Sequence, residues 1–153
     1  MKKLILTSAL VLFFAISMQS QVYSTALGLG IDSGNGATFV GPSVKHFFSE
    51  NHAGQAEVTF ETGVTAITAL YQFHDEFDGA NGLQWFAGGG ATLFSGSGDS
   101  LFALRGSLGL DFKIPGAPIA LAFDWRPALA LDGDAGNTFE AGAFGFGGRY
   151  VFN

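Results

Sequence analysis

The chain has 153 residues, a formal net charge of −6, no cysteine, 23 glycines and 17 phenylalanines. Hydrophobic residues make up 48% and charged residues 13% of the chain, whereas an ordinary soluble domain has about 25% charged residues. This composition argues against a disordered or a helical chain and excludes disulfides, and the lack of a basic patch argues against a nucleic-acid partner.

The N-terminal segment has the pattern of a secretory signal peptide. Lys2 and Lys3 precede an apolar core over residues 4–16, and small or polar residues follow. We expect residues 1–20 to form the signal peptide, with cleavage as late as residue 24, and residues 21–153 to form one domain. An uncleaved membrane anchor would need a longer apolar core.

The rest of the chain has no apolar run long enough for a transmembrane helix. Short segments of alternating apolar and polar residues recur instead, separated by Gly, Asp, Asn, Ser and Pro. The strands predicted in this way are 23–31, 38–48, 55–62, 64–74, 83–94, 101–113, 119–131 and 138–152. Lengths of about 9–11 residues suit tilted strands that cross a bilayer. An even number of such strands with short connections predicts an all-β, eight-stranded antiparallel up-and-down transmembrane β-barrel.

The segment IALAFDWRPALAL, residues 119–131, indicates which face lies outside. Large apolar residues occupy one face, while alanines, Asp124 and Arg126 occupy the other. Eight strands enclose only a narrow interior, so the bulky face belongs outside and the small or charged face inside. This arrangement favours a membrane barrel over a soluble lipocalin-like barrel, in which the faces would be reversed.

Aromatic residues near the predicted strand ends suggest two interfacial girdles. The first would contain Tyr23, Phe47, Tyr71, Phe73, Trp85, Phe112 and Phe152. The second would contain Phe39, Phe60, Phe94, Phe102 and Phe139. Pro42 and Pro127 fall inside predicted strands of a barrel that has no free edge, so we expect bulges there or strand ends beyond the hydrocarbon.

The C-terminal sequence FGFGGRYVFN places Phe144, Phe146, Tyr150 and Phe152 at alternating positions, followed by Asn153. It resembles the last strand of Gram-negative outer-membrane barrels, which the barrel-assembly machinery recognises. VKHFFSENHAGQAEV resembles a strand–turn–strand unit of such barrels, and the chain from residue 21 resembles the OmpA/OmpX-type barrel without a periplasmic domain. The resemblance implies an integral outer-membrane protein in contact with lipids and lipopolysaccharide. We expect it to be a monomer without a cofactor.

Charged residues on the predicted inner face form the main candidate site. Asp124 and Arg126 should pair directly, with Arg105 near them on the neighbouring strand and Ala143 and Gly145 opposite. One interpretation is a plug of salt bridges, and the other is a narrow polar pore kept open by interior glycines. The residues expected to face inward are Glu57, Glu61, Arg105, Asp111, Lys113, Asp124, Arg126 and Arg149.

No motif in the sequence predicts catalysis or metal binding. We expect His46, His52 and His74 near exposed periplasmic turns, because they lack the spacing of metal ligands. The loops 32–36, 95–100 and 132–137 should face outside the cell, and turn chemistry explains their Asp, Gly and Asn residues. We therefore expect a structural, membrane-integrity or interaction role rather than an enzyme. The alternatives are a narrow channel for small solutes and a soluble lipocalin-like binding protein.

Overall fold

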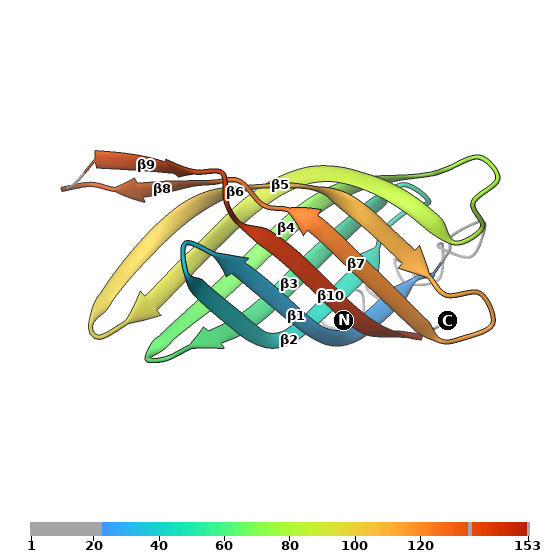
Figure 1. The fold of residues 1–153 in the computed structure, drawn as a ribbon, viewed down its shortest axis with the longest axis horizontal. Coiled ribbons are helices and arrows are strands. Elements are labelled where there is room, and N and C mark those ends of the chain that lie inside the picture. Colours follow the sequence, from blue (N-terminus) through green and yellow to red (C-terminus); the bar gives the residue numbers. More distant parts are fainter. Residues whose placement is uncertain (1–22, 135, 153) are drawn as a thin grey trace, which may run out of the picture.

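The computed structural model describes residues 23–134 and 136–152, so the predicted signal peptide over residues 1–20 lies outside the described residues. Within the described residues every regular element is a strand (Figure 1). The strands are β1 (Thr25–Gly34), β2 (Ala37–Phe47), β3 (His52–Glu61), β4 (Val64–Glu76), β5 (Leu83–Gly96), β6 (Asp99–Lys113), β7 (Ile119–Trp125), β8 (Ala128–Asp132), β9 (Gly136–Glu140) and β10 (Phe144–Phe152).

The strands form a closed, antiparallel, up-and-down barrel. Neighbours in sequence pair from β1 to β6, and β10 pairs with β1 to close the barrel. Strands β7 and β8 both pair with β6, while β10 pairs with β7 and β9 with β8. Strands β7 and β8 therefore form one long strand with a break, and so do β9 and β10. Counted in this way, the barrel has eight strands, and the predicted eight-stranded fold is confirmed.

The two ends of the barrel differ in their connections. Thr25 pairs with Phe152 at the end that we call the terminal end. Tight turns such as Asn35–Gly36 and Ser97–Gly98 join the strands at the opposite end, which we call the hairpin end. All four of these turn residues have positive φ, between 50° and 85°, which is the conformation of the type I′ turn that suits β-hairpins.

Pro127 lies in the break between β7 and β8. Its carbonyl accepts a hydrogen bond from Gly106 N at 2.8 Å, and the register with β6 is the same on both sides of it. The expected bulge lies on the opposite neighbour instead, where Ala141 and Gly142 face Pro127 alone and the register shifts by one residue.

The bulge expected at Pro42 is absent. Pro42 pairs with Leu29 of β1, and the register of β2 with β3 is the same before and after it. The proline lacks an N–H donor, and the ladder with β3 accordingly misses the pairs at Gly41 and Pro42 without any extra residue.

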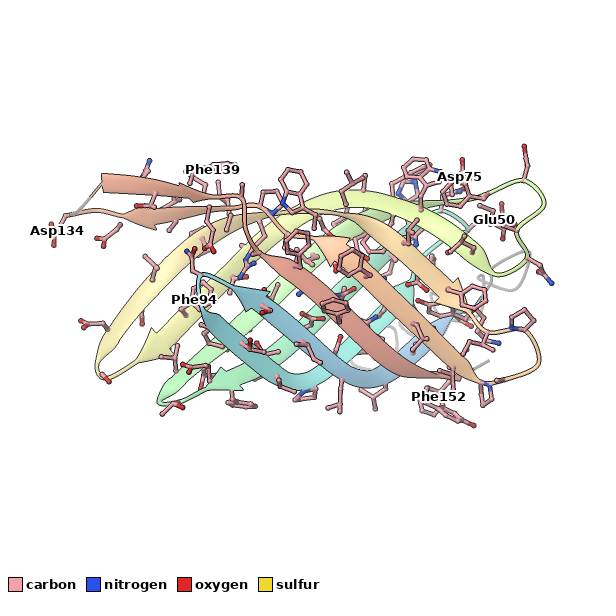
Figure 2. All side chains as sticks on the ribbon, viewed as in Figure 1. Glu50, Asp75, Phe94, Asp134, Phe139 and Phe152 are labelled. Carbon is pink, nitrogen blue, oxygen red and sulfur yellow. The ribbon has the colours of Figure 1, made fainter. Side chains whose placement is uncertain are left out.

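The predicted distribution of side chains over the two faces is confirmed. In β10, Phe146 and Tyr150 are about half exposed, whereas Gly147 and Arg149 are buried. Figure 2 shows the side chains on both faces of the strands. Large apolar side chains cover the outside of the whole barrel, and the buried interior is rich in polar and charged groups.

Four aromatic residues assigned to the girdles lie elsewhere. Tyr23 and Phe47 are each only 1% exposed and fill the terminal end of the interior. Tyr23 precedes β1 and so escapes its alternation, while Pro42 obscured the phase of β2. Phe39 and Phe94 fall on the inner faces of β2 and β5, where they line a cavity at the hairpin end.

Candidate functional site

Six charged side chains meet in the middle of the barrel, and we call them the central network. Its carboxylates are Asp32, Glu57 and Asp124, and its guanidinium groups are Arg105, Arg126 and Arg149. All six side chains are buried, and they come from β1, β3, β6, β7, β10 and the residue after β7. Equal numbers of opposite charges make the network neutral, so that the attraction between its members can offset the cost of removing each charge from water.

Arg126 is the hub of the central network. Its Nη1 lies 2.7 Å from Glu57 Oε2 and its Nε lies 2.9 Å from Asp124 Oδ2, while Asp32 Oδ2 is 3.7 Å away. Gly145 faces this guanidinium, and a Cβ at that position would overlap it. The glycine on the neighbouring strand therefore makes room for the long side chain, as the sequence predicted.

Arg105 and Arg149 complete the network. Arg105 Nη2 lies 2.9 Å from Asp32 Oδ2, and Arg149 Nη2 lies 3.3 Å from Glu57 Oε1. Ser43 Oγ accepts hydrogen bonds from Arg149 and donates one to Glu57 at 2.9 Å. Charged hydrogen bonds with several partners hold each side chain in one geometry, and the network links side chains from β1, β3, β6, β7 and β10 across the interior.

A second buried group closes the terminal end, and we call it the terminal cluster. Lys45 Nζ and the Tyr23 hydroxyl each donate to Asp111 Oδ2 at 2.8 Å. Aromatic rings surround this group: Lys45 lies over the ring of Phe86 at 4.4 Å, and His74 stacks on that ring with centroids 4.8 Å apart. The terminal cluster thus consists of Tyr23, Lys45, Phe47, His74, Phe86 and Asp111.

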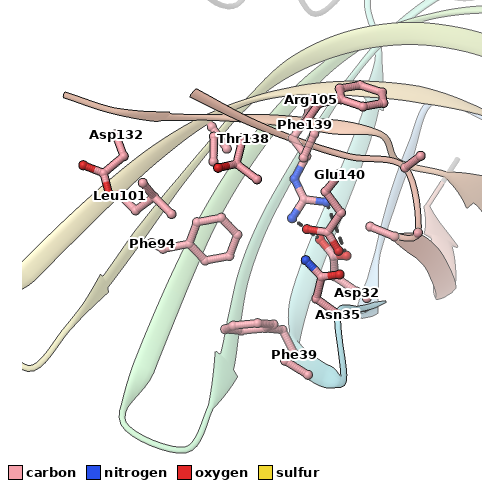
Figure 3. A pocket seen from close by; sticks show the side chains of 18 of the residues that line it. Asp32, Asn35, Phe39, Phe94, Leu101, Arg105, Asp132, Thr138, Phe139 and Glu140 are labelled. Atoms are coloured by element: carbon pink, nitrogen blue, oxygen red, sulfur yellow. Dashed lines mark hydrogen bonds and ion pairs between the residues drawn. The ribbon is translucent and has the colours of Figure 1, made fainter. Parts of the chain in front are cut away.

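A cavity of about 690 Å³ occupies the hairpin end, above the central network (Figure 3). Phe39, Phe94 and Leu101 form part of its wall, and the paired Arg105 and Asp32 lie among its lining residues. Glu140 of β9 also lines it. From the hairpin end to the terminal end, the interior therefore contains first the cavity, then the central network and finally the terminal cluster.

The predicted inward-facing residues divide into three groups. Glu57, Arg105, Asp124, Arg126 and Arg149 come together in the central network, and Asp111 lies in the terminal cluster. Glu61 is half-buried at the hairpin end and takes no part in the ion pairs of the network. Lys113 donates to the carbonyl groups of Ile114 and Ala117 at the other end of the barrel.

The expectation for Arg105 is confirmed in part, and that for His74 is wrong. Arg105 lies beside Arg126, whose carbonyl accepts a hydrogen bond from Arg105 Nη1 at 3.5 Å, but its ion pair is with Asp32 of β1, and the register places Gly109 opposite Asp124. His74 was expected at an exposed turn, but it is fully buried, because the alternation of β4 continues inward to this residue. The other two histidines lie at the outer surface, where His52 Nδ1 is 2.6 Å from the hydroxyl of Tyr71.

Three buried polar residues of the interior were missing from the predicted inner set, namely the charged Asp32 and Lys45 and the hydroxyl-bearing Tyr23. Asp32 stands in the string DSGNG, which has the composition of a loop, yet β1 continues through it to Gly34. Lys45 falls on the inner face of β2 when the alternation is counted back from Phe47. The charge balance gave no signal for either, because the predicted inner set already held four acidic and four basic residues.

Among residues 23–134 and 136–152, no group of three or more His, Asp or Glu side chains is arranged to hold a metal ion. The same part of the chain contains no helix that is long and apolar enough to cross a membrane.

Comparisons with protein-family models, with curated proteins and with solved structures found no match to this chain.

Proposed function

We propose that the protein is an integral outer-membrane barrel with a sealed interior and a structural, membrane-integrity or interaction role, and that it is neither a channel nor an enzyme. One observation carries the proposal: large apolar side chains face outward around the barrel, while charged side chains are buried within it. This is the arrangement of transmembrane barrels. A soluble barrel of lipocalin type, the alternative, would place its charges in water and its apolar side chains inside.

The outer surface supports a lipid environment. Leu29 in the middle of β1 is 58% exposed and Tyr150 of β10 is 53% exposed. A nearly apolar groove also crosses the outer face over β1, β10, β7, β6 and β5, and Leu121, Phe146 and Gly148 are among its lining residues. Apolar areas of this extent mark contact with a membrane or another protein, and acyl chains would fill such a groove.

Further parts of the proposal concern partners. Phe144, Phe146, Tyr150 and Phe152 all point outward from β10, in the pattern that resembles a signal for the barrel-assembly machinery. The exposed hairpin end carries acidic side chains such as Asp99, which suit divalent cations that bridge to lipopolysaccharide. We propose that outer-membrane lipids, including lipopolysaccharide, surround a monomeric barrel.

Two arginine substitutions on the outer face test the membrane proposal. In phospholipid vesicles, Leu29→Arg should lower the free energy of unfolding by about 2–4 kcal/mol, because its charge would lie near the bilayer centre. Phe60→Arg is the matched control, since Phe60 is also about half exposed but lies near the hairpin end; it should cost about 0–1 kcal/mol. Denaturant unfolding measures both.

A soluble barrel gives a different result. Leu29→Arg would then change stability by no more than about 0.5 kcal/mol, as at other exposed positions. Cell fractionation adds an independent readout, because a membrane barrel should sediment with outer membranes and migrate differently on gels before and after heating. Recovery of the unheated protein in the soluble fraction would overturn the membrane proposal.

Conductance separates the sealed barrel from the channel alternative. In planar bilayers the wild type should show a flat baseline, because the central network and the terminal cluster fill the interior in succession. Arg126→Ala should also stay flat, since the terminal cluster still closes the barrel. Ion currents through the wild type would contradict the sealed interior, and currents through Arg126→Ala alone would show that Arg126 is the seal.

A further inference from the structure

The cavity at the hairpin end has the size and lining of a ligand site. Its volume of about 690 Å³ lies within the range of about 300–1,000 Å³ that is typical of small-molecule pockets. Strands β1, β2, β5, β6, β8 and β9 all contribute to its lining. The lining combines inner-face residues of the closed strands, such as Phe39 and Phe94, with residues of the β8–β9 hairpin, and the inference below does not depend on whether the barrel lies in a membrane.

The wall of the cavity suits an apolar body. Phe39 and Phe94 lie with ring centroids 5.6 Å apart, and Leu101 is the register partner of Phe94 on β6. The rest of the wall includes Ala103, Ala128 and Ala130, whose small side chains leave space in the cavity. The ring of Phe94 also lies 5.7 Å from the guanidinium carbon of Arg105, so this ring already accepts a cation on its side.

The charge of the cavity is negative. Arg105 is the one Lys or Arg among the lining residues, and its ion pair with Asp32 neutralises it. Glu140 and Asp132 add two further carboxylates to the lining. Glu140 Oε1 is shielded from solvent and accepts no hydrogen bond from the described residues, which leaves a buried acceptor in need of a donor or a positive charge.

The wall beside Glu140 is not closed by strand pairing. Strand β9 pairs with β8, and β1 pairs with β10 only as far as Ser33 and Phe144. The β8–β9 hairpin therefore extends beyond the closed part of the barrel, as Figure 1 shows, and β9 presents an unpaired edge next to the cavity.

We propose that this cavity binds a small organic cation with an apolar body, of the aromatic ammonium class. The apolar body would pack on Phe39, Phe94 and Leu101, and the cationic head would lie by Glu140. Aromatic rings combined with carboxylates are the groups that recognise such ammonium ligands. The described residues form no group suited to a metal ion, so the negative charge points to an organic cation.

Calorimetric titration with three water-soluble probes tests the proposal on the folded full-length barrel. Benzyltrimethylammonium should bind, whereas the neutral benzyl alcohol and the anionic benzenesulfonate should bind at least about tenfold more weakly, because the carboxylates of the cavity attract a positively charged ligand. Glu140→Gln should weaken binding of the cation by about fivefold to tenfold. Phe94→Leu should weaken it by about threefold to fivefold without the same loss for benzyl alcohol.

Glu61→Gln is the matched control. It removes the same charge from the same end of the barrel, but Glu61 does not line the cavity, so the affinity for the cation should change less than about twofold at physiological salt. Equal binding of all three probes, equal losses in Glu140→Gln and Glu61→Gln, or no binding to the wild type would each overturn the proposal. Far-ultraviolet circular dichroism confirms that each variant keeps its β-sheet structure.

Discussion

Replacing Arg126 with methionine is expected to lower the free energy of unfolding of the barrel by about 3–5 kcal/mol. Arg126 bridges Glu57 at 2.7 Å and Asp124 at 2.9 Å, and its own side chain is 1% exposed. Methionine preserves much of the side-chain volume but removes the positive charge, so one buried carboxylate would lack a counterion. Equilibrium unfolding in denaturant, followed by tryptophan fluorescence, measures the loss.

A double variant distinguishes the charge effect from a packing effect. When Asp124→Asn is combined with Arg126→Met, the remaining charges form two matched pairs, Arg105 with Asp32 and Arg149 with Glu57. Because no buried charge is then unpaired, the double variant should regain more than half of the lost stability. Lys113→Met, at the partly exposed edge of the barrel, should change stability by no more than about 0.5 kcal/mol. Equal losses in the single and double variants would contradict the charge argument.

The architecture was predictable because a strand has a period of two. Where the alternation is unbroken, as in β6 and β10, the sequence alone assigned each face correctly. The inner positions of Glu57, Asp111 and Arg149 follow from that alternation and from nothing else. The predicted loops 32–36 and 95–100 contain the turns Asn35–Gly36 and Ser97–Gly98, but they were too long, because β1 runs to Gly34, β5 runs to Gly96 and β6 begins at Asp99.

The contacts across the barrel were not predictable from the sequence. Register arithmetic gives the neighbours on adjacent strands, but Arg105 pairs with Asp32 across the interior from β6 to β1. Such contacts depend on the tilt and stagger of all eight strands together. The cavity depends on the breaks at Pro127 and at Ala141, which separate the β8–β9 hairpin from the closed wall.

Glycines in β5 explain how eight strands can close around so many side chains. Gly88 and Gly90 lie so close to β4 that a Cβ at either position would overlap a backbone carbonyl, that of Tyr71 or Ala69. Glycine in a strand often marks the close approach of another backbone, and strong coiling of the sheet requires it here. Gly88 and Gly90 therefore serve the curvature of the wall, whereas Gly145 and Gly147 make room for the guanidinium groups of Arg126 and Arg149.

Gly90→Ala should consequently destabilise the barrel by about 3 kcal/mol, even though the substitution adds a single methyl group. The obstacle is the carbonyl of Ala69, which is backbone in a paired strand and has no alternative rotamer. Gly148→Ala is the matched control, because a Cβ there would meet only Leu121 Cδ2, at 4.0 Å; it should change stability by no more than about 0.5 kcal/mol. Denaturant midpoints and the yield of heat-modifiable barrel measure both variants. If Gly90→Ala were as stable as Gly148→Ala, the close approach of β4 and β5 would not be what closes the barrel.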